Sequence, residues 1–355
     1  MRRLVFILAC LLCMPALAAP PQLSTVTPGR ALSFPRDFGA HPDFRTEWWY
    51  ATGWLQTPDG KPLGFQVTFF RSATGHDADN PSRFAPKQLV IAHAALSDPA
   101  VGRLLHDQKS ARAGFGHAWA REGNTDVRLG QWTFVRGEDG RYDTVVEARE
   151  FGLRLTLTPT QPLMLQGENG YSRKGPQPGQ ASYYYSEPHL RVSGTVSREG
   201  KAQQVSGSAW LDHEWSTTVL DPRAAGWDWT GVNLDDGASL VAFRIRGKDG
   251  GTLWSHAKLR NADGSTRSFG PDEVSFVPLR QWRSARTGAS YPVALRIRTG
   301  DTDWALQPLQ DDQELDSRQS TGAVYWEGAV TVQRDGEPAG RGYLELTGYV
   351  KAMKL

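Results

Sequence analysis

Short segments in which apolar and polar residues alternate recur along the whole chain, separated by turn residues. Alternation with a period of two is typical of a β-strand with one buried face. In the first such segment, 44–56, Glu47 and Trp49 fall on the same face. A turn signal at 57–60 and an alternating segment at 63–71 follow, and together they predict a β-hairpin.

The repeated pattern predicts an all-β fold. We count about sixteen candidate strands, a number that suits two eight-stranded antiparallel barrels, each wide enough for one small ligand. Turn formers are abundant, with 37 Gly and 22 Pro. Only the short segment 311–320 has the period of a helix. The segments 207–217 and 226–235 are predicted to form a second hairpin.

The first eighteen residues have the pattern of a secretory signal peptide. Arg2 and Arg3 precede an apolar stretch, and Ala16-Leu17-Ala18 is an A-x-A cleavage site. A lipoprotein cysteine at Cys10 would leave almost no signal sequence before it. No later stretch is long and apolar enough to cross a membrane. We therefore expect cleavage near Ala18 and a periplasmic or secreted protein that is not an integral membrane protein.

Composition excludes several classes of function. The two cysteines, Cys10 and Cys13, would both leave with the signal peptide, so the mature chain would have no disulfide and no thiol nucleophile. Loss of Arg2 and Arg3 would lower the formal charge from +2 to 0. Without a basic block, nucleic acid is not expected as a partner.

The run 210–217 is the strongest candidate for a functional site. It contains Asp212, His213 and Glu214 between two tryptophans, and a second aromatic group, 226–229, follows it. Titratable groups walled by indole rings suit a binding or catalytic pocket. In a regular strand, His213 faces opposite to Asp212 and Glu214. We expect His213 inside the barrel and the two carboxylates outside or at its rim, unless a bulge turns one inward.

Two side chains have a catalytic and a structural interpretation. His213 is either a general base in a cavity or a core histidine bonded to Asp98 or another carboxylate. Glu47 is either a general acid whose pKa is raised by dry surroundings, or one half of an ion pair with Arg71 or Arg45. Asp212 and Glu214 are further catalytic candidates beside them.

Several aromatic and polar side chains are candidates for lining a ligand cavity. Trp227 and Trp229 share one face and could form a platform for an apolar ligand, although aromatic residues in barrels often serve as core. His93 is either catalytic or a satisfied core histidine. Tyr184 belongs to a tyrosine triplet that borders the cavity or bridges the two barrels. The predicted ligand-binding set is Trp49, Gln66, His93, Tyr184, Trp215, Trp227 and Trp229.

No cofactor or metal is expected from the sequence. The chain contains no G-x-S-x-G, H-E-x-x-H, P-loop or G-x-G-x-x-G motif. Asp212, His213 and Glu214 cannot jointly bind one ion from a straight strand, because His213 faces away from the other two. A metal site would need His93 or another distant ligand.

The ordered motifs resemble the two-domain lipocalin-like family that contains AttH and the carotenoid 1,2-hydratases (hydroxyneurosporene synthases). The matching segments are 47–50 with Gly53, 64–71, His93 with 97–98, 207–216, 226–229 and 343–349. The resemblance implies two calycin-type barrels packed side by side around an apolar cavity. From the signal pattern, a proline-rich stretch after it and a hinge placed near 216–222, we predict four regions: a signal peptide (1–18), an extended arm (19–39), an N-terminal barrel (40–218) and a C-terminal barrel (219–355).

The resemblance to the hydratases is incomplete. It implies cofactor-free addition of water to an isoprenoid double bond, with an Asp as proton donor on the strand after the tryptophan-rich turn. In this chain that strand, 239–246, contains no carboxylate, which places the chain nearer to AttH.

Three functions remain open at this stage. The chain is an exported binder of an apolar, lipid- or isoprenoid-like small molecule, or a cofactor-free hydratase, hydrolase or isomerase that uses His213 and Glu47 as acid and base. In the third interpretation it is a structural partner in the cell envelope, and its tryptophans are all core.

Overall fold

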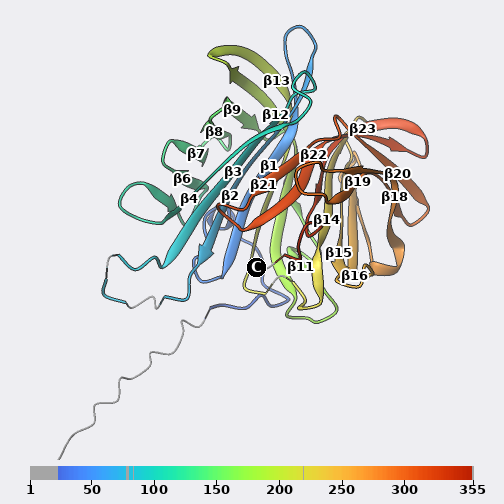
Figure 1. The fold of residues 1–355 in the computed structure, drawn as a ribbon. Coiled ribbons are helices and arrows are strands. Elements are labelled where there is room, and N and C mark those ends of the chain that lie inside the picture. Colours follow the sequence, from blue (N-terminus) through green and yellow to red (C-terminus); the bar gives the residue numbers. More distant parts are fainter. Residues whose placement is uncertain (1–22, 77–79, 83, 219, 354–355) are drawn as a thin grey trace, which may run out of the picture.

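The computed structural model describes residues 23–76, 80–82, 84–218 and 220–353. The predicted signal peptide and its cleavage site at Ala18 lie outside the described residues. Figure 1 shows two antiparallel sheets side by side, the first coloured from blue to green and the second from yellow to red. Among the described residues, no helix has both the length and the apolar character needed to span a bilayer.

The first sheet has thirteen strands, in the order β4-β3-β2-β1-β13-β12-β9-β8-β7-β6-β5, with β10 and β11 paired to β12. It curls on itself, so that β6 contacts β3 and β4. Its strands are β1 (Thr46–Gln56), β2 (Pro62–Ala73), β3 (Gln88–Ser97), β4 (Leu104–Arg112), β5 (Ala118–Ala120), β6 (Asp126–Leu129), β7 (Trp132–Arg136), β8 (Tyr142–Glu147), β9 (Phe151–Thr158), β10 (Met164–Leu165), β11 (Tyr171–Arg173), β12 (Ala181–Arg198) and β13 (Lys201–Ser216).

The second sheet has ten strands, in the order β17-β16-β15-β14-β23-β22-β20-β19-β18, with β21 paired to β22. Its strands are β14 (Ala224–Leu234), β15 (Ser239–Gly247), β16 (Thr252–Arg260), β17 (Thr266–Phe269), β18 (Val274–Arg283), β19 (Ser290–Thr299), β20 (Thr302–Pro308), β21 (Glu314–Ser317), β22 (Ala323–Arg334) and β23 (Glu337–Leu346). Two single-turn 3-10 helices, η1 (Arg36–Phe38) and η2 (Pro271–Glu273), lie outside the sheets.

The all-β fold with two antiparallel barrels side by side is confirmed. The predicted first hairpin is β1 and β2, with Gly53 opposite Phe65. Two local predictions are wrong. The segment 311–320 is not helical and contains β21 instead. The segments 207–217 and 226–235 do not pair with each other, because β13 pairs with β1 and β12, whereas β14 pairs with β15 and β23.

Each barrel has its own apolar core, and a third cluster lies between the two. The first core includes Phe65 and Trp132, and the second includes Trp304 and Trp326. The third cluster joins β1 and β13 to β14, β15 and β23; its buried members are Tyr50, Trp54, Met164, Trp210, Ala224, Trp229, Val241, Phe243, Ile245, Ala329 and Tyr343. The outer face of β1 and β13 is therefore covered by the second sheet.

Candidate functional site

The pairing of β1 with β13 sorts the predicted site residues onto two faces. Trp49 lies opposite His213, and Tyr50 lies opposite Asp212. Because successive side chains of a strand point to opposite faces, Glu47, Trp49 and His213 point into the first barrel. Asp212 and its like-facing neighbours point toward the second sheet. The predicted alternation is thus present, and it creates two separate sites.

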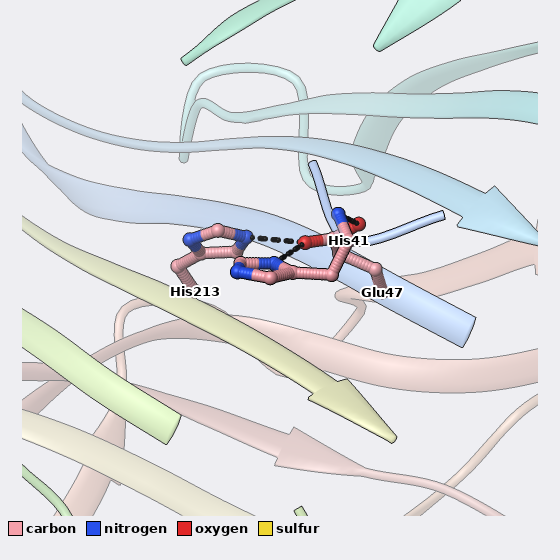
Figure 2. Close-up of side chains that lie close together, drawn as sticks. All are labelled: His41, Glu47 and His213. Atoms are coloured by element: carbon pink, nitrogen blue, oxygen red, sulfur yellow. Dashed lines mark hydrogen bonds and ion pairs between the residues drawn. The ribbon is translucent and has the colours of Figure 1, made fainter. Parts of the chain in front are cut away.

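Inside the first barrel, Glu47 accepts hydrogen bonds from two imidazoles (Figure 2). Its Oε1 lies 2.6 Å from His41 Nδ1 and 2.9 Å from His213 Nε2. Arg71 Nε donates to the other oxygen at 2.8 Å, so the predicted ion pair with Arg71 is present. Asp98 pairs with Arg198 rather than with His213. Glu47, His213 and Arg71 are almost completely buried.

The prediction that Glu47 is a general acid with a raised pKa is wrong, because the pKa is shifted in the opposite direction. Burial would raise that pKa, but hydrogen bonds from His213 and His41 hold it well below its ordinary value. Burial lowers the pKa of His213 to about 4, against the opposing effect of Glu47. The group at this position is therefore an ionised, fully bonded carboxylate, which has no proton to donate.

The two tryptophans of this region pack against the imidazoles. Trp215 is stacked on His41 with 3.7 Å between ring centroids, and Trp49 is stacked on His213 at 4.6 Å. Both indoles are almost fully buried. Trp49 belongs to the core of the first barrel, and Trp215 belongs to a separate cluster with Phe38 and Tyr185. Their predicted role in lining a ligand cavity stays a prediction.

A cavity of about 110 Å³ lies on the other face, between the two sheets. It is walled mainly by aromatic rings and carries an unusual number of carboxyl groups. Its lining consists of Thr46, Trp48, Tyr50, Thr68, Phe70, Lys174, Asp212, Glu214, Leu220, Trp227, Trp229, Phe243, Ile245, Tyr325, Glu327 and Glu345.

Asp212 and Glu214 point outward from the first barrel, as expected, and there they face this cavity rather than solvent. The outer face of β13 is buried under the second sheet, so both are almost fully buried. Asp212 accepts hydrogen bonds from Tyr184 OH at 2.7 Å and from Trp210 Nε1 at 2.7 Å. Burial raises the pKa of Asp212 to about 7. Glu214 forms an ion pair with Lys174 Nζ at 3.0 Å.

Two further carboxyl groups in the cavity wall, Glu327 and Glu345, were not among the predicted site residues. They lie opposite each other on β22 and β23. Tyr50 OH donates to Glu327 Oε2 at 2.9 Å, and the other oxygen of Glu327 has no hydrogen-bond partner within the described part of the chain. Burial and the neighbouring Glu345 raise the pKa of Glu327 well above its ordinary value.

Trp227, another residue of the cavity wall, binds Glu345. Trp227 Nε1 donates to Glu345 Oε2 at 2.9 Å, and burial raises the pKa of Glu345 to about 7. A signal for Glu327 was present in the sequence, since it is the one charged residue in the apolar strand 323–330. That Glu327 lines a cavity beside another carboxyl group follows only from the pairing of β22 with β23 and from their contact with β1, which is far away in the sequence.

The remaining predicted ligand-binding residues lie near this cavity but not all in its lining. Trp227 and Trp229 line it directly. Tyr184 OH accepts a hydrogen bond from Trp229 Nε1 at 3.1 Å behind the wall. Gln66 Nε2 donates to the cavity residue Thr68.

His93 does not converge with Glu47 and His213. Its Nδ1 lies 2.6 Å from Tyr325 OH, and its Nε2 lies 2.8 Å from Ser320 Oγ, so it connects β3 to the second sheet. Its burial lowers its pKa to about 3, which keeps the ring neutral. This geometry supports the interpretation of His93 as a satisfied buried histidine.

A larger recess of about 760 Å³ lies between the sheets near Trp54, His189 and Arg341. Glycine backbone and hydroxyl or amide side chains form much of its surface. The carboxyl groups with raised pKa line the smaller cavity instead. Because perturbed titratable groups gather at functional sites, the smaller cavity is the candidate site.

Comparison with known proteins identifies a family. A family model described as AttH-like matches residues 25–349. The crystal structure of an AttH protein from Nitrosomonas europaea is 67% identical, covers 92% of this chain and 100% of its own, and superposes with a TM-score of 0.87. No match is found among proteins with curated descriptions.

Two more distant structures share the fold. Kievitone hydratase from Nectria haematococca is 15% identical, with a TM-score of 0.69 over 94% of this chain and 98% of its own. A structure of CghA is also 15% identical, with a TM-score of 0.53 over 93% of this chain and 98% of its own. At this level of identity the likeness concerns the fold alone.

Proposed function

Since this chain belongs to the AttH-like family, we propose that it binds an apolar small molecule in the cavity between its two sheets and transfers a proton to it there. The aromatic wall supports the binding part of the proposal. Trp48, Trp227 and Trp229 offer large apolar faces, while the carboxyl groups offer a few fixed polar contacts. Ligand sites typically combine such a wall with few polar groups.

The environment of Glu327 carries the catalytic part of the proposal. A carboxyl group whose pKa lies far above its ordinary value keeps its proton at neutral pH. One of its oxygens is bound by Tyr50, and the other is free of partners among the described residues while the side chain lines the cavity. It is therefore a candidate general acid in dry, aromatic surroundings.

Hydration of a carbon–carbon double bond is the reaction that fits this acid. The π electrons of the alkene take the proton of Glu327 to form a C–H bond, and the O–H electron pair stays on Glu327 as a carboxylate. The indole faces of Trp227 and Trp229 stabilise the resulting carbocation. Water then adds to the cation, and its surplus proton returns to the Glu327–Glu345 pair. The distant relative named as a hydratase favours the same class of reaction.

This proposal moves the acid chemistry away from the pair predicted from the sequence. Glu47 is held as a carboxylate by Arg71 and two histidines, and the cluster points away from the cavity. Asp212, which was also a candidate, stays one, because its pKa of about 7 suits a group that exchanges a proton with water.

Ligand binding is tested with the purified full-length protein and two probes small enough for a cavity of about 110 Å³, prenol for isoprenoids and crotonic acid for fatty acids. We expect quenching of tryptophan fluorescence by one of them at one equivalent per chain, and weaker quenching in Trp229→Leu. Trp119→Leu, a change on β5 outside the cavity, is the matched control. The binding proposal fails if neither probe binds, or if both variants bind as well as the wild type.

Catalysis is tested separately with the probe that binds. Incubation in water labelled with oxygen-18 should give a product that carries one labelled hydroxyl group, detected by mass spectrometry. Binding without any labelled product would leave the first part of the proposal standing and overturn the second.

We also propose that the protein is exported, on the basis of the signal-like pattern of residues 1–18. The intact mass of the protein recovered from a periplasmic fraction should correspond to a chain that begins just after Ala18. Recovery of the full-length chain from the cytoplasm alone would contradict export.

A further inference from the structure

The cluster inside the first barrel combines the donor atoms of a metal centre. His41 Nδ1, Glu47 Oε1 and His213 Nε2 all lie within 4.8 Å of one another, and all three side chains are buried (Figure 2). Two imidazoles and one carboxylate form a donor set that suits divalent first-row transition ions. We propose that His41, Glu47 and His213 form a binding site for one such ion, with Zn²⁺ as the reference case.

The partners behind the two imidazoles support this assignment. His41 Nε2 lies 3.2 Å from Asp37 Oδ1, and His213 Nδ1 lies 3.1 Å from Tyr185 OH. Each ring therefore has its outer nitrogen bound to a carboxylate or hydroxyl group, while its inner nitrogen points at Glu47. Metal-binding histidines typically have such outer partners, which fix the orientation of the ring.

The carboxylate is held in the same way. Glu47 Oε2 accepts hydrogen bonds from Arg71 Nε at 2.8 Å and from the backbone N–H of His41 at 2.8 Å. These two donors satisfy the outer oxygen and leave Oε1 directed at the imidazoles. The stacked indoles of Trp215 and Trp49 restrict rotation of the two histidine rings. The donors are therefore preorganised.

The spacing of the donors is compatible with an ion after a small adjustment. Zn²⁺ binds imidazole nitrogen and carboxylate oxygen at about 2.0–2.2 Å, which places neighbouring donors about 3 Å apart. The two nitrogens now lie 2.6 and 2.9 Å from Glu47 Oε1. Shifts of the three side chains, whose donor atoms all lie within 4.8 Å of one another, would admit the ion in place of the bridging protons. Entry is easiest beside His41, which is 9% exposed, whereas Glu47 and His213 are fully buried.

This site is independent of the cavity chemistry, because its side chains lie on the opposite face of β1 and β13. It also differs from our expectation that no metal would bind, which considered only residues on strands. The missing ligand, His41, comes from the loop before β1, where no periodic pattern marks it.

The test uses the mature protein, which begins after Ala18 and so lacks both cysteines, freed of metals by dialysis against a chelator. Isothermal titration with Zn²⁺ should show one high-affinity site per chain, and Co²⁺ should give the visible absorption of an ion held by nitrogen and oxygen. His41→Gln should abolish both signals. His117→Gln, a change at an exposed histidine, should leave both unchanged and serves as the control for adventitious surface binding.

Asp37→Asn separates a metal site from a merely structural cluster. Loss of this outer partner should weaken Zn²⁺ binding about 10–100-fold, while Co²⁺ absorption is restored at higher ion concentration. If His41→Gln does not fold, this variant and the wild-type Co²⁺ spectrum still decide the question. The proposal is overturned if the wild type binds no ion, if Asp37→Asn binds Zn²⁺ as tightly as the wild type, or if a folded His41→Gln does so.

Discussion

Buried carboxyl groups on the two faces of β1 and β13 have pKa values that are shifted in opposite directions. On the inner face, Glu47 has a guanidinium and two imidazoles within hydrogen-bond distance, and its pKa is held low. On the outer face, Asp212 has only neutral donors around it, and its pKa rises to about 7. Both groups are buried, so burial alone does not decide the protonation state.

The difference is the presence of a cationic partner. Removing a carboxylate from water disfavours its charged form, and a nearby cation offsets that cost. For Glu47, the hydrogen bonds from His213 and His41 provide this compensation, beside the ion pair with Arg71. Glu327 has only Tyr50 and faces another carboxyl group, Glu345. The interior of the first barrel therefore holds Glu47 as a charged carboxylate, whereas the cavity between the sheets holds carboxyl groups that keep their protons.

The largest effect is expected from Glu327→Gln, which keeps the shape of the side chain and removes its acidic proton. The rate at which the alkene substrate is hydrated should fall about 10²–10⁴-fold. The infrared carbonyl band of a protonated carboxyl group should also be lost at neutral pH. Glu314→Gln is the matched control, because Glu314 is a buried glutamate with Arg286 as a partner at 3.3 Å. Equal infrared spectra for the wild type and Glu327→Gln would contradict a protonated Glu327.

A second large effect is expected from Arg71→Met, which removes the guanidinium that pairs with buried Glu47. The free energy of unfolding should fall by about 3–5 kcal/mol, because a buried charge loses its partner. Urea denaturation followed by tryptophan fluorescence measures this change. Arg298→Ala, which breaks an exposed pair with Asp303, should cost less than about 1 kcal/mol. Similar losses for the two variants would remove the contrast between the regions.

The sequence was sufficient for the fold class and for one face of the site. Period-two alternation identified the first hairpin and separated His213 from Asp212 and Glu214. These are local properties, because side chains of one strand alternate whatever the strand pairs with. What covers each face depends on contacts between distant segments, so the burial of Asp212 and Glu214 was missed.

The same limit explains the other errors. Glu327 and Glu345 become part of the site only because β22 and β23 pack against β1, where Tyr50 contacts Glu327 directly. His41 lies in a loop and joins Glu47 through the tertiary fold. The predicted pairing of 207–217 with 226–235 failed because closing each barrel gives these strands other partners.

A smaller, pH-dependent effect should distinguish the cavity carboxyls in stability measurements. The pKa of Asp212 rises from 3.8 to about 7, so between these values the folded chain keeps a proton that the unfolded chain has lost. This contribution to stability is complete below pH 4 and is lost as pH rises toward 7, at up to about 1.4 kcal/mol per pH unit.

Asp212→Asn should therefore flatten the dependence of unfolding free energy on pH between about 4 and 7. The measurement is a series of urea denaturation curves across that range, with Asp303→Asn, an exposed change, as the control. A wild-type curve that rises with pH in step with the Asp212→Asn curve would show that this group is already ionised.

The smallest effect compares one indole from each region. Trp227→Phe keeps an aromatic ring in the cavity but removes the N–H that donates to Glu345 at 2.9 Å. Glu345 would then no longer be fixed in the cavity wall, and probe affinity should fall by up to about fivefold, since one hydrogen bond is worth roughly 1 kcal/mol. Trp49→Phe removes an indole stacked on His213, so it should lower the melting temperature and leave probe affinity unchanged. If Trp49→Phe weakens binding as much as Trp227→Phe does, the two faces of β1 do not act separately, and the ligand is not confined to the space between the sheets.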